Sequence, residues 1–218
     1  RPPKSTLFPY TTLFRSTTTT GQHKGVRDIP PDQPFPFPFH ENYDAYVDGA
    51  TPRYHSDQKG TFAVAARPGG GRCLQQIVPH QGYLWQYMPN VRKPYTVIGD
   101  QEWRDYSVSA DVFIKSGDVE LGGRFGDINK LSYRFTLDRK GGWRLAYQDR
   151  TLAAGTVADF NAQHWHTMKL RLHGEEISAF LNGAGLCSVQ DGERTFGMAC
   201  LASSYDANCF DDLHIEKP

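Results

Sequence analysis

The stretch YSVSADVFI, residues 106–114, decides the fold class of this 218-residue chain. Its apolar residues fall on every second position: Tyr106, Val108, Ala110, Val112 and Ile114. This period of two is typical of a strand with one face buried and the other face wet. The segment HWHTMKLRLHG, residues 164–174, repeats the pattern, with Met168, Leu170 and Leu172 opposite Thr167, Lys169 and Arg171. We therefore expect both segments to be strands of antiparallel sheets.

Similar short runs, separated by turn residues, continue along the chain. We predict twelve strands, at residues 61–67, 73–78, 94–98, 105–115, 119–126, 131–138, 142–148, 151–157, 165–173, 176–182, 195–202 and 209–216. The glycines in DRKGGW (138–143) and LNGAG (181–185) suit hairpin turns, so strands 131–138 and 142–148 should pair antiparallel. No long helix is predicted. The fold class is all-β, two packed antiparallel sheets in a sandwich or jelly roll.

Composition excludes several classes of function. The 24 basic and 24 acidic residues cancel, and no basic stripe is present, so we expect no nucleic-acid partner. No apolar run reaches the roughly 20 residues that cross a bilayer. The four cysteines show no CxxC spacing, which argues against a zinc or thioredoxin-type motif, while free thiols and disulfides both stay open.

The first 40 residues differ from the rest. Residues 1–16, which include TLFPYTTLFRS, resemble a widely used short-read sequencing adapter translated in one frame, so we expect them to be an artefact that makes few contacts. Residues 17–40 are polar and then rich in proline, as in a linker from missing N-terminal domains. Phe35, Phe37 and Phe39 alternate there and could instead pack as an edge strand. Residues 41–218 are expected to form the sandwich.

No catalytic motif stands out. Glycoside hydrolysis needs two carboxylates across a scissile bond, and the spacing E-x-D-x-x-E is absent. Asp118 and Glu120 lie two residues apart in GDVELGG (117–123), but the surrounding glycines indicate the start of a strand. GxSxG and HExxH are also absent. We predict no catalytic residue in this chain.

Binding residues are easier to nominate. The segment YLWQYM (83–88) is dense in aromatic rings, and the C–H face of a sugar packs on such rings, so Tyr83, Trp85 and Tyr87 are candidate carbohydrate-binding residues. Core packing is the alternative for each ring. His164 and His166 flank Trp165 on one expected strand, where a solvated face is the simpler interpretation than a metal site.

A structural calcium ion is also expected. Sandwiches of this kind often join their first and last strands through aspartates and backbone carbonyls, which are the oxygen ligands that calcium prefers. Asp44 in ENYDAY (41–46) and Asp211 in CFDDLHIE (209–216) are the candidate ligands. Surface acidity or capping explains both residues equally well.

Several pieces, in this order, resemble the C-terminal lectin-type domain of the galactosylceramidase family, glycoside hydrolase family 59. They include IGDQEW (98–103) leading into DVFI (111–114), GGRF (122–125), HWHTMKLRLHG (164–174) and FDDLHIE (210–216). Single pieces are generic to laminin-G-like sandwiches, so a stand-alone carbohydrate-binding module or an adhesion domain is the alternative. The resemblance implies a concanavalin A-like, laminin-G-like lectin fold.

The resemblance also implies a function for the parent protein. It would be a retaining hydrolase that removes β-galactose from galactosylceramide or another β-galactoside, with both catalytic glutamates on a missing N-terminal TIM barrel followed by a small β-sandwich. This fragment alone would be inactive. A lysosomal or secreted location and a saposin-type lipid carrier as partner are further expectations. The charged segment 133–149 and the absence of Asn-x-Ser/Thr sites depart from the animal enzymes and leave the lipid substrate and the lysosomal address open.

Overall fold

The computed structural model describes residues 31, 33–80, 93–126, 132–205 and 207–218. Contacts divide the chain after Pro34, and the unit Phe35–Pro218 is described here by itself. No described residue is helical, and the described part has no helix that is long and apolar enough to cross a membrane. The expected artefact, residues 1–16, lies outside the described residues.

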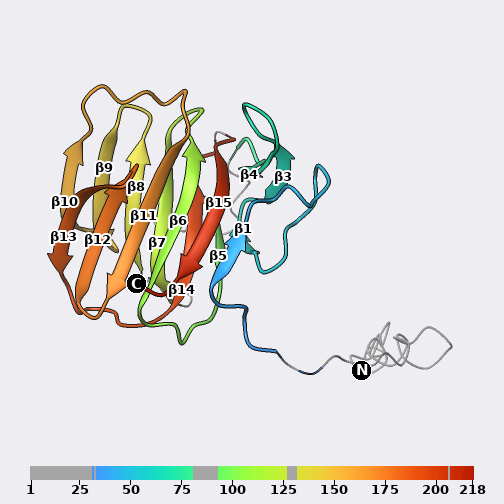
Figure 1. Ribbon diagram of the computed structural model, residues 1–218. Coiled ribbons are helices and arrows are strands. Elements are labelled where there is room, and N and C mark those ends of the chain that lie inside the picture. The colour runs from blue at the N-terminus through green and yellow to red at the C-terminus, as the bar shows by residue number, and fades with distance from the viewer. Residues whose placement is uncertain (1–30, 32, 81–92, 127–131, 206) are drawn as a thin grey trace, which may run out of the picture. The chain divides into compact units, whose positions relative to one another are not determined.

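Two antiparallel sheets form the unit, one in front of the other in Figure 1. Sheet A has eight strands: β1 (Phe39–Glu41), β3 (Phe62–Ala66), β4 (Arg72–Gln76), β6 (Tyr106–Phe113), β11 (His166–His173), β12 (Glu176–Leu181), β13 (Ala184–Gln190) and β15 (Cys209–Glu216). Sheet B has seven: β2 (Ser56–Lys59), β5 (Tyr95–Ile98), β7 (Asp118–Phe125), β8 (Tyr133–Asp138), β9 (Gly142–Tyr147), β10 (Arg150–Thr156) and β14 (Met198–Ser203). The all-β sandwich predicted from the sequence is confirmed.

Strand order places the first and last strands of the unit side by side. Sheet A runs β13-β12-β11-β6-β15-β4-β3, and sheet B runs β10-β9-β8-β7-β14-β5-β2. The last strand, β15, pairs with β6 along one side and with β4 and then β1 along the other. The alternating phenylalanines lead into this arrangement, because Phe39 starts β1 while Phe35 and Phe37 pack against the core.

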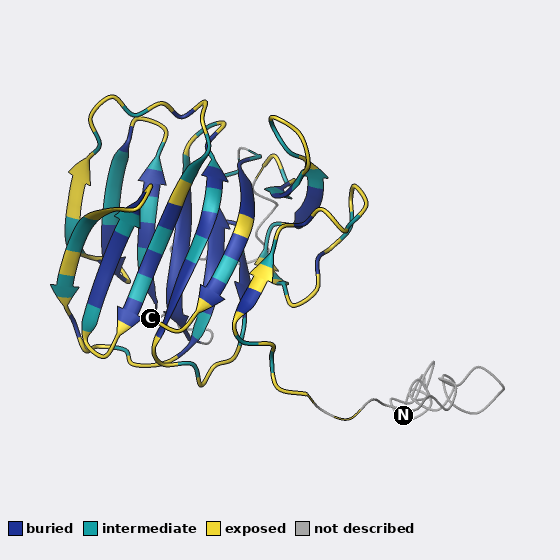
Figure 2. Ribbon diagram, viewed as in Figure 1, coloured by how far each residue is buried: buried dark blue, intermediate teal, exposed yellow. Residues whose placement is uncertain are grey.

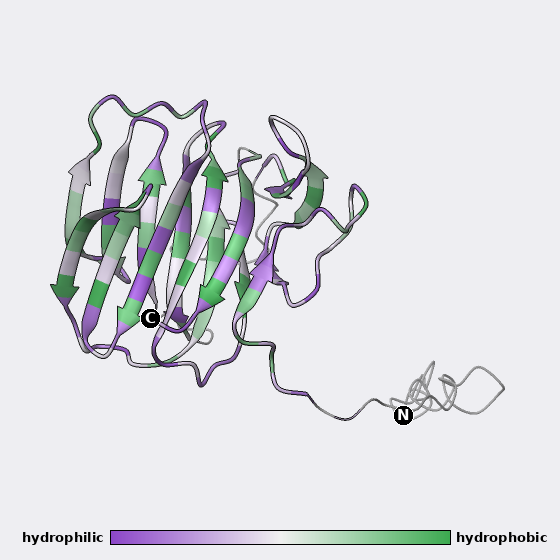
Figure 3. Ribbon diagram, viewed as in Figure 1, coloured by the Kyte–Doolittle hydropathy of each residue, from purple (hydrophilic) through white to green (hydrophobic). Residues whose placement is uncertain are grey.

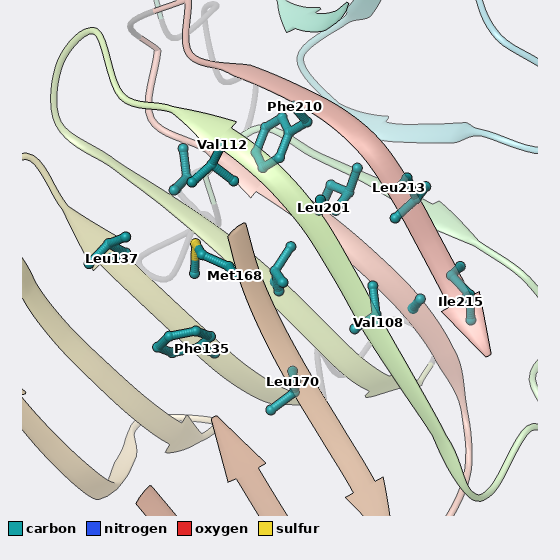
Figure 4. Packing of buried hydrophobic residues seen from close by; sticks show 14 of the residues in the cluster. Val108, Val112, Phe135, Leu137, Met168, Leu170, Leu201, Phe210, Leu213 and Ile215 are labelled. Carbon is teal, nitrogen blue, oxygen red and sulfur yellow. The ribbon is translucent and has the colours of Figure 1, made fainter. Parts of the chain in front are cut away.

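The core lies between the sheets, as the alternation in β6 and β11 predicts. Tyr106, Val108, Ala110, Val112 and Ile114 are all at most 1% exposed. Figure 4 shows the side chains of β6, β11 and β15 pointing toward those of β8 and β14. Burial of this contiguous apolar layer stabilises the fold, and the dark strand centres in Figure 2 mark it.

All twelve expected strands are present, with ends that differ by a few residues. Three observed strands were not among the twelve: β2 and β13 were missed, and β1 was anticipated only through the alternative edge strand at Phe35, Phe37 and Phe39. Trp165 lies outside β11, which begins at His166. His164 belongs to the preceding turn, so the expectation that His164 and His166 share a strand face is wrong. The hairpin between β8 and β9 is confirmed, with Tyr133 opposite Tyr147. All four cysteines are free thiols.

Candidate carbohydrate-binding face

The outer faces of the two sheets differ in chemistry. Sheet A alternates sharply in Figure 3, and its outer face carries ion pairs such as Lys169–Glu216 and Arg171–Glu176. On sheet B, the core takes Ile98, Ala199 and Leu201, so their strand neighbours project outward. These neighbours form a second apolar cluster in which Val97, Phe125 and Cys200 are at most 6% exposed and Tyr95 and Met198 pack beside them. The part of sheet B formed by β5, β14 and the end of β7 therefore has an apolar outer face.

A hollow of about 750 Å³ opens beside this cluster. Its described lining comes from the linker end, the segment around β2, and strands β5, β7 and β14: Phe35, Tyr54, His55, Ser56, Gln58, Tyr95, Val97, Gly99, Gln101, Phe125 and Met198. The volume falls in the range of sites that take one small molecule. These residues are distant in the sequence, and the sheet order brings them together.

Aromatic packing fixes one rim of the hollow. The Phe35 ring lies edge-on to Tyr54, with centroids 4.9 Å apart, and to Trp103, at 5.0 Å. Gly99, with φ +105°, lets Trp103 approach, because a Cβ at this position would lie 2.2 Å from the indole. Tyr54 is half exposed, so its ring offers a face to a ligand.

His55 supplies a polar group at the hollow. Its Nδ1 lies 2.8 Å from the Arg53 carbonyl, which can only accept, so Nδ1 carries the proton and donates. Nε2 then accepts from the Tyr43 hydroxyl, at 3.2 Å. Burial lowers the pKa of His55, and burial followed by the charge of Glu41 raises the pKa of Tyr43. Both groups are therefore neutral at pH 7 and hold fixed orientations.

The chemistry of the lining points to a neutral ligand. The described lining includes no carboxylate, lysine or arginine, but it offers aromatic rings, a hydroxyl and the amides of Gln58 and Gln101. Such groups bind the apolar face and the hydroxyls of a sugar. They cannot act as the acid and nucleophile of glycoside hydrolysis.

The paired acids Asp118 and Glu120 do not change this conclusion. Asp118 forms an ion pair with Lys93, and Glu120, 5% exposed, accepts a hydrogen bond from Thr136 at 3.3 Å. Neither lines the described part of the hollow. Both carboxylates therefore have roles in the fold.

The predicted sugar-binding residues Tyr83, Trp85 and Tyr87 lie outside the described residues. Their segment connects β4 to β5, and β5 contributes Tyr95 and Val97 to the hollow. The sequence interpretation missed the hollow itself. The segment YTVI (95–98) carried a signal for it, because apolar side chains occur on both faces of this strand. Ile98 faces the core, whereas Tyr95 and Val97 face outward.

The predicted calcium ligands Asp44 and Asp211 both have partners within the protein. Asp44 Oδ1 accepts from the Arg72 amide at 2.9 Å, and it lies 3.1 Å from the point where a Cβ on Gly71 would sit. Arg67 Cδ is 3.8 Å from that same point, and Arg67 Nε donates to Asp211 Oδ2 at 2.5 Å. Arg67 thus fills a position at Asp211 that a calcium ion would need, and the carboxylates fit an ion only with that guanidinium moved.

A different trio satisfies the geometric test for a metal site. His40, Asp212 and His214 are, among the described residues, the one group of three acidic, histidine or cysteine side chains whose ligand atoms all lie within 4.8 Å of one another. None of the three was singled out from the sequence, because 172 residues separate His40 from Asp212.

Comparison with known proteins identifies the family to which the chain is similar. A family model described as the galactocerebrosidase C-terminal lectin domain matches residues 57–218. Galactocerebrosidase of Canis lupus familiaris is 28% identical over 232 residues, which cover 94% of this chain and 33% of that protein. The Homo sapiens galactocerebrosidase is 29% identical over 201 residues, covering 80% and 27%. The chain thus spans about a third of the length of these relatives.

Solved structures with the same fold are more distant in sequence. The carbohydrate-binding module CBM66 from Bacillus subtilis has a TM-score of 0.57 at 14% identity and covers 75% of this chain and 96% of its own. The Bacillus licheniformis β-glucanase has a TM-score of 0.55 at 11% identity, covering 83% and 98%. At these identities the likeness establishes the sandwich fold alone.

Proposed function

The chain belongs to the family of galactocerebrosidase C-terminal lectin domains, and from this membership we propose that it is the lectin-like part of a glycoside hydrolase that removes β-galactose from galactosylceramide or a related β-galactoside. The match over residues 57–218 carries the proposal. The parent chain would supply both catalytic glutamates from an N-terminal TIM barrel, followed by a small β-sandwich. This piece alone would not hydrolyse a glycoside.

The proposed role of this piece is to contact the sugar or to support the barrel. The neutral, aromatic hollow on sheet B supports sugar contact. Tyr83, Trp85 and Tyr87 stay proposed sugar-binding residues on the strength of their aromatic sequence. A lysosomal or secreted location and a saposin-type lipid carrier follow from the same family reasoning. We also retain structural calcium at Asp44 and Asp211, on the condition that Arg67 moves aside.

Sequencing the gene upstream of this chain tests whether the parent protein is a hydrolase. Sequence upstream of Thr17 should encode a barrel with two glutamates, and expression of the joined chain should give β-galactosidase activity that this piece lacks. An upstream region without such a barrel would refute the hydrolase and favour the stand-alone carbohydrate-binding module.

Sugar contact is tested on the purified chain by calorimetry with β-galactosides. Loss of one ring should weaken binding about three- to ten-fold, so Tyr54→Ala and Tyr95→Ala should raise the Kd by this factor. Phe180→Ala is the matched control, since it removes a partly exposed ring from sheet A. If the wild type binds no galactoside, sugar contact is refuted and the supporting role alone remains. If all three variants lose the same amount of affinity, the hollow is not the sugar-binding site.

A further inference from the structure

Three side chains from the two ends of the sandwich meet on the outer face of sheet A. His40 of β1 stands directly opposite His214 of β15, and Asp212 lies two residues before His214 on the same strand. Phe39, Leu213 and Ile215 point into the core, so the trio projects outward. The side chains of His40, Asp212 and His214 are 49%, 51% and 40% exposed, so solvent and ions reach them.

The ligand atoms of the trio all lie within 4.8 Å of one another. The two imidazole rings stack with centroids 4.0 Å apart and planes 17° from parallel. Asp212 Oδ1 lies 2.7 Å from His40 Nε2 and 3.3 Å from His214 Nε2. A tetrahedral zinc ion with bonds of about 2.0–2.1 Å holds its ligand atoms roughly 3.3 Å apart. The His214–Asp212 distance already matches this value. Binding an ion would require one imidazole to rotate out of the stack, so that both ring planes contain the ion, and this rotation would also lengthen the short His40–Asp212 distance.

The backbone holds this arrangement in place. The β15–β6 register shifts between Asp211 and His214, and Asp212 adopts φ +47°, a conformation that is costly for a residue other than glycine. This irregularity turns the Asp212 carboxylate toward the histidines. The Asp212 amide donates to Asp211 Oδ1 at 2.8 Å, and Arg67 holds the other oxygen of Asp211. These hydrogen bonds fix the backbone at Asp212, from which its carboxylate projects.

The ligand types select the ion. Two imidazole nitrogens and one carboxylate oxygen suit zinc and neighbouring transition metals, whereas calcium prefers six or more oxygens. We propose that His40 Nε2, His214 Nε2 and a carboxylate oxygen of Asp212 form a zinc site that ties β1, the first strand of the unit, to its last strand, β15. Water fills the fourth position. The site is separate from the sugar hollow, which lies on sheet B. It shares no ligand with the Asp44–Asp211 pair, although the Asp212 amide donates to Asp211.

The test uses the full 218-residue chain, stripped of metal and titrated with Co²⁺ and Zn²⁺. Co²⁺ should give the intense visible bands of a tetrahedral ion, and excess Zn²⁺ should abolish them. A ligand at 100 times its Kd stabilises a fold of this size by about 5–10 °C in Tm. We expect that shift in the wild type, with at least ten-fold weaker binding in His214→Ala and in Asp212→Asn.

His173→Ala is the matched control, because it removes an exposed histidine from another strand of sheet A and should leave binding unchanged. The double variant His40→Ala/His214→Ala reports binding by every other histidine in the chain. Circular dichroism of the metal-free variants should match the wild type, so that a loss of binding is not a loss of fold. Equal affinity in the wild type and the double variant, or an octahedral cobalt spectrum, would overturn the proposal.

Discussion

Replacing Asn208 with alanine should destabilise the sandwich more than any comparable change of a surface asparagine. Asn208 is fully buried where the chain crosses from β14 to β15. Its Oδ1 accepts from the amides of Lys115 and Ser116, at 2.8 and 3.2 Å, in the crossing from β6 to β7. Its Nδ2 donates to the Asp118 carbonyl at 3.1 Å and to the Ser203 hydroxyl at 3.1 Å. One side chain therefore joins two crossings between the sheets.

The magnitude follows from the groups left without partners. An unsatisfied buried amide costs about 1–3 kcal/mol, and because Lys115 and Ser116 lie partly at the surface we take about 1 kcal/mol for each. Loss of the Nδ2 hydrogen bonds adds about 1 kcal/mol. The sum is about 3 kcal/mol, which lowers the Tm of a domain of this size by roughly 6–12 °C.

Urea unfolding followed by circular dichroism measures this difference. Asn161→Ala is the matched control, since the exposed Asn161 side chain accepts from the Gln163 amide at 3.0 Å and its loss should cost under about 1 kcal/mol. Asn208→Asp keeps the acceptor but loses the donors and buries a charge, so it should not rescue stability. Equal unfolding free energies for Asn208→Ala and Asn161→Ala would refute the reasoning.

Three further predictions concern pH, metal and thiols. Burial raises the pKa of Asp191, but hydrogen bonds from Tyr133, at 2.7 Å, and Arg150 outweigh it, so the folded pKa lies below the ordinary value. The charged carboxylate then contributes stability above its unfolded pKa of about 4 that is lost as pH falls through the folded pKa. Tyr133→Phe should therefore lower the free energy of unfolding at pH 7, and the difference from the wild type should become smaller below about pH 4. If acid denaturation curves show the same difference at every pH, the Tyr133 hydrogen bond does not stabilise the charged form of Asp191. If calcium binds at Asp44 and Asp211, adding Ca²⁺ to the metal-free chain should raise the Tm of the wild type and of His214→Ala, but not the Tm of Asp44→Asn. A wild-type Tm that does not change on adding Ca²⁺ would refute the calcium hypothesis. Of the four free thiols, the partly exposed Cys187 on edge strand β13 should react first with a thiol reagent at neutral pH. The buried Cys73, Cys200 and Cys209 should react only after unfolding. Mass spectrometry that finds early labelling of any of these three would contradict their burial.

The two strands that the sequence interpretation missed outright, β2 and β13, have no buried residue, although β10, which was predicted, has none either. β6 and β11 alternate because the core takes every second side chain. β2 (SDQK) and β13 (AGLCSVQ) lie at the edges of their sheets and pair on one side only. No member of β13 is fully buried, so selection for an apolar face is weak there. Edge strands of this kind carry little periodic signal.

The hollow and the histidine–aspartate trio were less predictable than the fold, because the pairing register of distant strands brings their residues together. Nothing in the local sequence near Tyr54 places that ring against Phe35, and a one-residue shift in β1 would turn His40 into the core. His214 alone reads as one of eight scattered histidines. A bulge in β15 and the pairing with β1 bring the trio together, and both depend on contacts across the whole chain.

The contrast between the two outer faces decides where a ligand or another domain can bind. A sheet face exposed to water is stable when it is polar, and sheet A meets this condition with its ion pairs and serines. Sheet B does not, since Val97, Phe125 and Cys200 are buried although they point away from the core between the sheets. Val97 and Phe125 also line the hollow that opens beside this cluster. This contrast is why we propose sugar contact at the hollow on sheet B and a separate, stabilising metal site at the histidine–aspartate trio on sheet A.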